Sequence, residues 1–129
     1  MYEQDYIMRQ IRDLVTFLAK VFLKKDSAIY ELPDMGQYTN TDYLHKELLF
    51  LLSQGKINEA ENLLFENMNI NNKRYMELAL DFYGRLNNFT DDYLEENNFT
   101  RKEIGEGLEE LIKEFGWGGI INGKNLSSR

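Results

Sequence analysis

The sequence predicts an all-α protein of about five to six helices, and three observations support this class. Pro33 is the only proline among 129 residues, and most glycines lie in the last quarter of the chain, so long stretches contain no strong helix breaker. Apolar residues recur at spacings of three and four, the period of an amphipathic helix. They make up 43% of the chain, which is enough for one core. We therefore predict a single helical domain over residues 1–129.

A long amphipathic helix is predicted over residues 5–25. Its apolar positions alternate between spacings of four and three, at Ile7, Ile11, Leu14, Leu18 and Val21. This face is wider than the seam of a two-stranded coiled coil, so it indicates packing against several helices of the same chain. Three lysines gather near its end, which also permits a membrane-surface interpretation: Lys20, Lys24 and Lys25. Their place at the negative end of the helix dipole explains them without a membrane.

Residues 26–40 are predicted to form a loop that crosses the core and is pinned on it. Pro33 and Gly36 interrupt the helical period, yet the segment keeps apolar and aromatic side chains that a free linker would not need. Tyr30 and Tyr38 combine apolar area with a polar tip, so we predict them as a candidate interaction surface. A mobile binding loop is the alternative interpretation.

Hairpin helices are predicted over residues 41–116. Gly55 suits the left-handed cap that ends one helix, and Asn58 with Glu61 forms a capping-box pattern that begins the next. Two helices this close in sequence must form an antiparallel hairpin.

Three more helix starts are predicted after this hairpin. One helix runs from about Lys73 to Leu86. The tetrapeptide Asn-Asn-Phe-Thr then occurs twice, ending at Thr90 and at Thr100, and each copy places a hydrophobic residue before an N-capping threonine. Each copy therefore marks a helix start.

A tail over residues 117–129 follows Gly116, which ends the last predicted helix. Trp117 is either a lid on the core or a docking anchor for a partner. We include it with Tyr30 and Tyr38 in the candidate interaction surface.

A shift of about 34 residues, the tetratricopeptide period, pairs Leu44 with Leu78 and Leu52 with Leu86. The turn Leu-Ser-Gln-Gly-Lys-Ile-Asn-Glu-Ala at residues 52–60 resembles the tetratricopeptide turn, in which glycine ends one helix and alanine lets the next approach closely. This resemblance implies tetratricopeptide-like helical hairpins.

The opening Tyr-Glu-Gln-Asp-Tyr-Ile-Met-Arg-Gln-Ile at residues 2–11, with Phe-Leu-Ala-Lys at residues 17–20, resembles an uncharacterised family of small bacterial proteins of unknown function. This resemblance extends over most of the chain and implies a bacterial cytoplasmic origin. It brings no activity and no site residues to transfer.

Composition disfavours several classes of partner. The net charge is −7, whereas a nucleic-acid binder needs clustered lysines and arginines, so no nucleic-acid partner is expected. No run of about 18 uncharged apolar residues occurs, so no membrane insertion is expected. The acidic N-terminus differs from a basic signal peptide, and cysteine is absent, so we expect a cytoplasmic location.

The sequence contains no catalytic motif that we can identify, so it predicts a protein that is not an enzyme, with no catalytic, cofactor-binding or metal-binding residues assigned. His45 is the only histidine and follows Asp42 by three residues, which permits a metal site or general base. The acidic residues of the C-terminal half favour a solvated helix face, and they are Asp91, Asp92, Glu95, Glu96, Glu103, Glu106, Glu109 and Glu110.

The leading functional hypothesis is a non-enzymatic protein-protein interaction module with a tetratricopeptide-like groove for a protein or peptide. A homodimer is a companion hypothesis, with the first helix or the tail as its interface. The alternative is a small-ligand or divalent-metal-binding helical protein that uses the acidic faces around Asp92 and Glu96, with His45.

Overall fold

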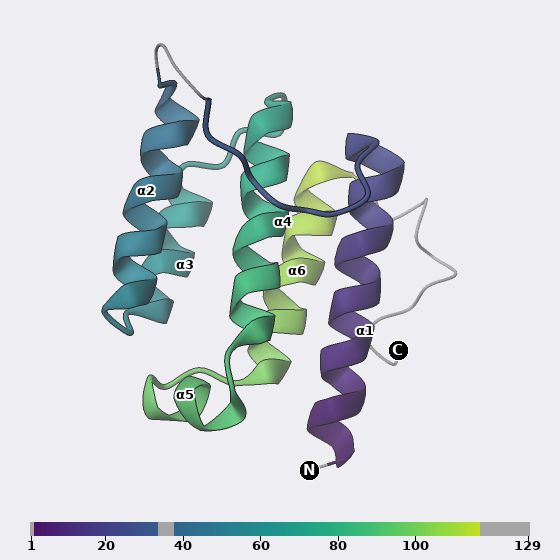
Figure 1. The fold of residues 1–129 in the computed structure, drawn as a ribbon, viewed down its shortest axis with the longest axis vertical. Helices are drawn as coiled ribbons and strands as arrows, with labels where there is room; N and C mark the ends of the chain where they lie inside the picture. Colours follow the sequence, from purple (N-terminus) through teal and green to yellow (C-terminus); the bar gives the residue numbers. More distant parts are fainter. Residues whose placement is uncertain (1, 34–37, 117–129) are drawn as a thin grey trace.

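Six α-helices and one π-helical turn form the fold of this chain in the computed structural model, which describes residues 2–33 and 38–116 (Figure 1). The elements are α1 (Tyr2–Leu18), η1 (Ala19–Leu23), α2 (Asn40–Ser53), α3 (Ile57–Glu66), α4 (Lys73–Asn88), α5 (Asp91–Glu96) and α6 (Arg101–Phe115). No strand occurs within these two ranges. The all-α prediction is confirmed, and so is the long N-terminal helix.

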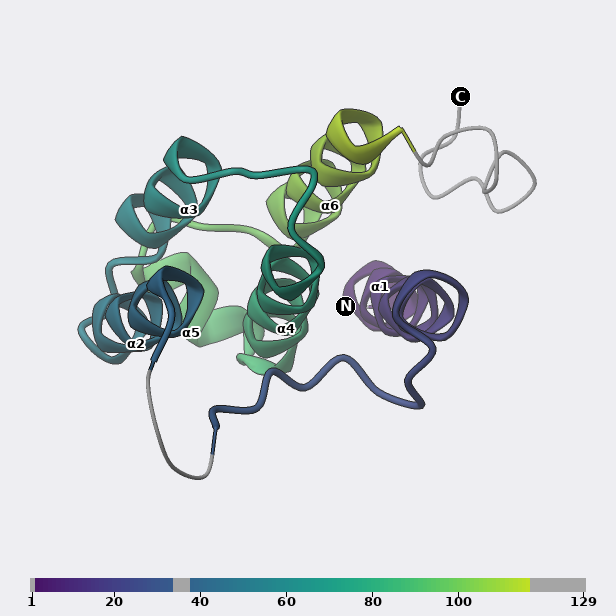
Figure 2. The same cartoon turned by 90° about the horizontal axis from the view of Figure 1, so that it is seen from above.

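Helix α4 lies at the centre of the molecule. It packs against α2 on one side and against α1 and α6 on the other, as the view from above shows (Figure 2). Ten of its 16 residues are buried, because a helix contacted on several sides exposes only a narrow stripe. The buried apolar side chains of α1, α2, α3, α4, α5 and α6 join in one core cluster.

The N-terminal helix packs its apolar face on α4 and α6. Ile11 and Leu18 are fully buried there, as their spacing predicts. The helix continues into the π-turn η1, and Lys24 ends it in the left-handed conformation. The observed end at Leu23 lies two residues before the predicted one. Within the described residues, no helix has the length and apolar character needed to cross a membrane.

The antiparallel α2–α3 hairpin turns at Gly55, which has the positive φ of 76° that glycine tolerates. A Cβ atom there would also collide with the side chain of Asn97. The predicted capping box at Asn58 is wrong, because α3 begins at Ile57 and its N-cap is Lys56, two residues before Asn58. Asn58 instead donates a hydrogen bond from Nδ2 to the carbonyl oxygen of Asn98, 3.1 Å away.

The two Asn-Asn-Phe-Thr copies begin α5 and α6, as predicted. The hydroxyl of Thr90 accepts a hydrogen bond from the amide of Tyr93, and Thr100 forms a full capping box with Glu103. Phe99, which precedes the second threonine, is buried in the core. These caps satisfy amide groups that the first turn of a helix leaves without partners.

Residues 24–33, which follow η1, cross the front of α4 (Figure 1), and we call them the crossing segment. Tyr30, which lies within it, is 4% exposed and belongs to the core cluster. The prediction of a loop pinned on the core is therefore confirmed at this residue.

Candidate functional site

Tyr30 lies between α2 and α4 and bonds to both helices. Its hydroxyl donates to Oδ1 of Asp42 on α2 at 2.6 Å, and its backbone amide donates to Oδ1 of Asp81 on α4 at 3.2 Å. The prediction of Tyr30 as a surface for partners is thus wrong, because its ring and both of these polar groups are used inside the protein.

Arg74 covers the Tyr30 ring from the outside, with Cζ 4.1 Å from the ring centroid. Its guanidinium contacts Oδ1 of Asp42 at 3.0 Å and Oε1 of Glu77 at 2.8 Å. It also donates to the carbonyl oxygen of Glu31 at 2.8 Å. One cation therefore ties the crossing segment to two helices, and stacking on an aromatic face adds to its attraction.

His45 lies beneath the Tyr30 ring, with ring centroids 4.6 Å apart. Its Nδ1 is 3.9 Å from Oδ2 of Asp81, which is bound more tightly by Nε of Arg85 at 2.7 Å. Burial lowers the pKa of His45, and this effect outweighs the opposing charge of Asp81. His45 is therefore neutral at pH 7. We call Tyr30, Asp42, His45, Arg74, Glu77, Asp81 and Arg85 the Tyr30 network.

Asp42 is charged because three neighbours bind it. Burial alone would raise the pKa of its carboxyl, but hydrogen bonds from Tyr30, Thr39 and Arg74 outweigh burial and lower that pKa to about 2. Burial and the acceptor Asp42 raise the pKa of the Tyr30 hydroxyl above its ordinary value. The pair thus consists of a neutral donor and a charged acceptor, which is a strong kind of hydrogen bond.

The Asp42 carboxyl predicts an acid-dependent loss of stability. A pKa lowered from 3.8 to about 2 stabilises the folded state above pH 3.8, and this contribution is lost as the pH falls through about 2. We expect about 2 kcal/mol of the free energy of unfolding to depend on it. Urea denaturation at several pH values between 2 and 6 should show a flatter profile for Asp42→Asn than for the original protein. Parallel profiles for the two proteins would contradict this assignment.

The other predicted site residues do not join this network. Tyr38 is half-buried, with its ring 5.7 Å from that of Tyr43 and under the Nζ atom of Lys46 at 4.8 Å. Trp117 lies outside the described residues. Asp92 and Glu96 are exposed on α5, whereas His45 is buried on α2. Within residues 2–33 and 38–116, no group of three acidic or histidine side chains is placed to hold a metal ion.

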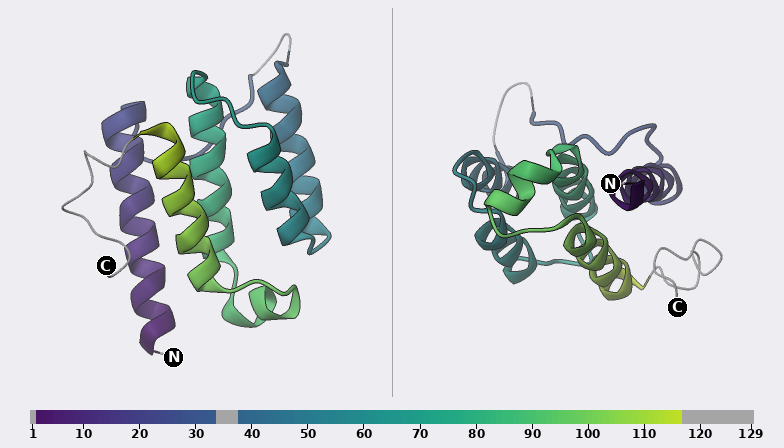
Figure 3. Two further views of the ribbon diagram at one scale, coloured as in Figure 1. Left: turned by 180° about the vertical axis from the view of Figure 1, so that it is seen from behind. Right: turned by 90° about the horizontal axis from the view of Figure 1, so that it is seen from below.

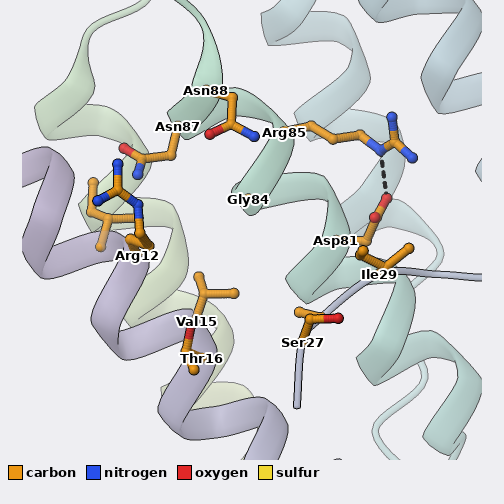
Figure 4. A pocket seen from close by; sticks show the side chains of 12 residues that line it. Arg12, Val15, Thr16, Ser27, Ile29, Asp81, Gly84, Arg85, Asn87 and Asn88 are labelled. Atoms are coloured by element: carbon orange, nitrogen blue, oxygen red, sulfur yellow. Dashed lines mark hydrogen bonds and ion pairs between the residues drawn. The ribbon is translucent and has the colours of Figure 1, made fainter. Parts of the chain in front are cut away.

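A cleft opens beside the Tyr30 network, between α1, the crossing segment and α4 (Figure 4). Its volume is about 450 Å³, and we call it the front cleft. Its walls are Ile11, Arg12, Val15 and Thr16 from α1, Ser27, Ala28 and Ile29 from the crossing segment, and Asp81, Gly84, Arg85, Asn87 and Asn88 from α4. Asp81 and Arg85 belong to both the cleft and the network.

A second hollow is lined by residues of α3, the turn after it and α6. Figure 3 shows these two helices behind α4. The hollow consists of two adjoining parts of about 350 and 570 Å³ that share Phe65, and we call it the α3–α6 groove. Its lining comprises Glu61, Asn62, Phe65, Met68, Asn69 and Ile70, followed on α6 by Glu103, Glu106, Gly107, Glu110 and Glu114.

Glu61 lies at the floor of the α3–α6 groove, where its Oε2 accepts a hydrogen bond from the hydroxyl of Tyr83 at 2.7 Å. Burial raises the pKa of Glu61, and the charges of Glu103 and Glu106 raise it further. Gly107 faces the same place, because a Cβ atom there would collide with the Tyr83 hydroxyl and with Glu61. The missing side chain at Gly107 thus makes room for this pair.

Sequence reasoning missed both hollows and the charged members of the Tyr30 network that lie on α4. The charged residues at positions 74, 77, 81 and 85 recur at helical spacing, a pattern typical of a solvated face. The crossing segment covers this face instead. For the network, Tyr30 was an available signal, since a tyrosine in a polar loop can anchor it to a core.

These features define a small all-α protein in which a central helix is covered in front by a bonded crossing segment. The family model for a family of unknown function, DUF6483, matches residues 1–116, and the chain belongs to that family. The resemblance proposed from residues 2–11 and 17–20 to an uncharacterised family is thereby confirmed. No curated protein and no solved structure matches the chain.

Proposed function

We propose that this protein is a non-enzymatic protein-interaction module and that the α3–α6 groove is its partner-binding surface. The observation that carries the proposal is an apolar side of the groove next to a row of glutamates on α6 that form no ion pair within residues 2–33 and 38–116. Fold alone would be a weak argument, because similar folds serve many functions.

The tetratricopeptide-like interpretation supports a binding role, but the surface that such repeats use for peptides is not the one that we propose. The hairpin turn at Gly55 suits that repeat, whose inner helices present a concave face to peptides. In this chain the corresponding face of α2 and α4 is covered by the crossing segment, whose Tyr30 bonds to both helices. Arg74 of α4 lies over Tyr30 and bonds to Asp42 of α2. We therefore place the partner on the opposite side of α4.

The acidic side of the groove comes from one stripe of α6. Glu103, Glu106, Glu110 and Glu114 follow one another at spacings of three and four, so they lie on one helix face. No ion pair within the described residues includes any of them. Such a row attracts cations at long range and favours a partner of positive charge.

The apolar side of the groove comes from the end of α3 and the turn after it. Phe65 and Met68 are half-buried there, and Ile70 is 48% exposed. Together with the glutamates they form an amphipathic surface, which fits a partner helix with apolar residues on one face and lysine or arginine beside it. The partner class we propose is a basic amphipathic helix.

This proposal predicts a charge-specific interaction. A designed helical peptide of ~14 residues, with leucines on one face and lysines on the other, should bind the intact protein in calorimetric titration. The Glu106→Lys/Glu110→Lys variant should weaken binding by about tenfold or more, since it reverses two charges on the groove. The same peptide with glutamates in place of lysines should not bind.

The control has the same net charge but leaves the groove intact. Glu95 and Glu96 are exposed on α5, so Glu95→Lys/Glu96→Lys changes the total charge equally. It should retain binding apart from a small loss that salt removes. If both double variants weaken peptide binding equally, the interaction is non-specific electrostatic attraction, and the groove is not the binding surface.

The remaining expectations about assembly and location belong to this proposal. A homodimer through the first helix or the tail is tested by light scattering at high concentration, where a monomeric mass rejects it. The bacterial cytoplasm suits a chain without cysteine. The alternative is a metal-binding protein that uses Asp92, Glu96 and His45. Thermal unfolding with and without divalent ions tests it, since a bound metal raises the melting temperature.

A further inference from the structure

We propose that the front cleft binds a small organic anion, a carboxylate or a phosphate monoester that carries a short apolar body. This site is separate from the α3–α6 groove, and its volume of about 450 Å³ lies in the range of small-molecule sites. Three features of the cleft favour such a ligand: its charge, its free polar groups and the missing side chain at Gly84.

The charge of the front cleft is opposite to that of the whole protein. Its lining holds two arginines and one aspartate, which leaves one positive charge in a chain of net charge −7. Asp81 is already bound by Nε of Arg85 at 2.7 Å. Arg12 forms no ion pair within the described residues, so its guanidinium is the group free to bind an anion.

Neutral donors add to this charge. Asn88 is exposed, and neither its side-chain amide nor the hydroxyls of Thr16 and Ser27 hydrogen-bond within the described part of the chain. Asn87 differs, because its Nδ2 donates to the carbonyl oxygen of Met8 and its Oδ1 accepts from Arg101. Figure 4 shows Arg12 on the α1 side of the cleft and Arg85 directed to Asp81 on the other side. One anionic group is therefore assigned to Arg12, not to both arginines.

Gly84 of α4 lines the cleft together with residues of α1 and leaves the helix backbone uncovered there. A Cβ atom on Gly84 would meet no other atom within 4 Å, so open space lies directly above the helix backbone. Val15 and Ile29 provide apolar surface on the other walls. A short hydrocarbon body lying over Gly84 would bury this surface, while its anionic end contacts Arg12.

Gly84 also allows a test that separates binding from folding. Gly84→Ala and Gly84→Leu place side chains in open space and replace glycine within a helix, which should raise the melting temperature or leave it unchanged. The leucine side chain would occupy the room for the ligand body. Loss of binding without loss of stability would therefore report the cleft itself.

The experiment is calorimetric titration of the intact protein with hexanoate, hexyl phosphate and uncharged hexanol, each up to about 10 mM. We expect hexanoate, hexyl phosphate or both to bind, and the stronger of the two identifies the anionic group. Arg12→Gln and Gly84→Leu should each weaken binding by about tenfold or more, and Gly84→Ala by less. Arg9→Gln, on an exposed residue of α1 outside the cleft, should leave binding unchanged.

Three results would overturn the proposal. They are binding of hexanol as tight as that of the anions, no binding of either anion, and equal affinity of Gly84→Leu and the original protein. If neither small anion binds but a peptide with acidic side chains binds at this cleft, the cleft is a peptide site and not a small-molecule site. None of these results bears on the α3–α6 groove, which a cationic probe tests independently.

Discussion

Replacing Arg101 by methionine is expected to lower the free energy of unfolding by about 3 to 5 kcal/mol. Arg101 is 3% exposed, and its guanidinium donates to the carbonyl oxygens of Asn87 at 2.7 Å and Phe89 at 2.9 Å. It also pairs with Asp91. Methionine fills similar space but leaves these acceptors without their donor, and buried unsatisfied groups are costly.

Urea denaturation followed by circular dichroism measures this effect, with Lys102→Met as the matched control. Lys102 is the exposed next residue on α6, so its loss should change stability by less than about 0.5 kcal/mol. Hydrogen exchange should also rise first in α5, because Arg101 joins the end of α4 to α5 and α6. A similar small effect for both variants would show that Arg101 is dispensable.

Replacing Tyr30 by alanine is also expected to lower the free energy of unfolding by about 3 to 5 kcal/mol. The substitution removes a buried ring, the hydrogen bond to Asp42 and the aromatic face beneath Arg74. Since Tyr30 bonds the crossing segment to both α2 and α4, we expect this segment to become accessible to protease when the side chain is removed. Limited proteolysis and denaturation of the same sample measure both outcomes.

Two controls divide the Tyr30 effect into its parts. Tyr30→Phe keeps the ring and should cost about 1 to 2 kcal/mol, the range for one buried hydrogen bond to a charged acceptor. Tyr43→Ala removes a tyrosine that is 60% exposed and should have little effect. A loss for Tyr30→Ala no larger than for Tyr43→Ala would contradict the role of the crossing segment.

The local signals of the sequence predicted most helices because each acts within a few residues. Gly55 provides a positive φ and ends α2, and Thr90 and Thr100 cap the helices that follow them. Asn58 failed as a cap because α3 begins at Ile57, which places Asn58 inside the first turn, where its Nδ2 bonds to the carbonyl oxygen of Asn98, 40 residues away in sequence. A capping pattern cannot report such a partner.

The candidate sites could not be predicted because they depend on which helices become neighbours. Glu103 and Glu106 have the spacing of a solvated helix face, and Glu106 is indeed exposed. The sequence does not show that these glutamates line the same groove as Phe65 of α3. Gly84 gave the clearest unused signal, since an isolated glycine within a helix often marks space for another group. That this glycine lines a cleft could be recognised only once α1 was known to lie opposite α4.

The N-terminal helix also determines how the fold could be extended. It packs on α4 and α6, where a further hairpin would be added in a repeat array, but it runs antiparallel to α4 (Figure 1). A repeat added there would keep the direction of α4. In such an array, helix α1 would end the stack on that side, and only the α2–α3 side, where Phe50 and Tyr43 of α2 are largely exposed, would be open to a further hairpin.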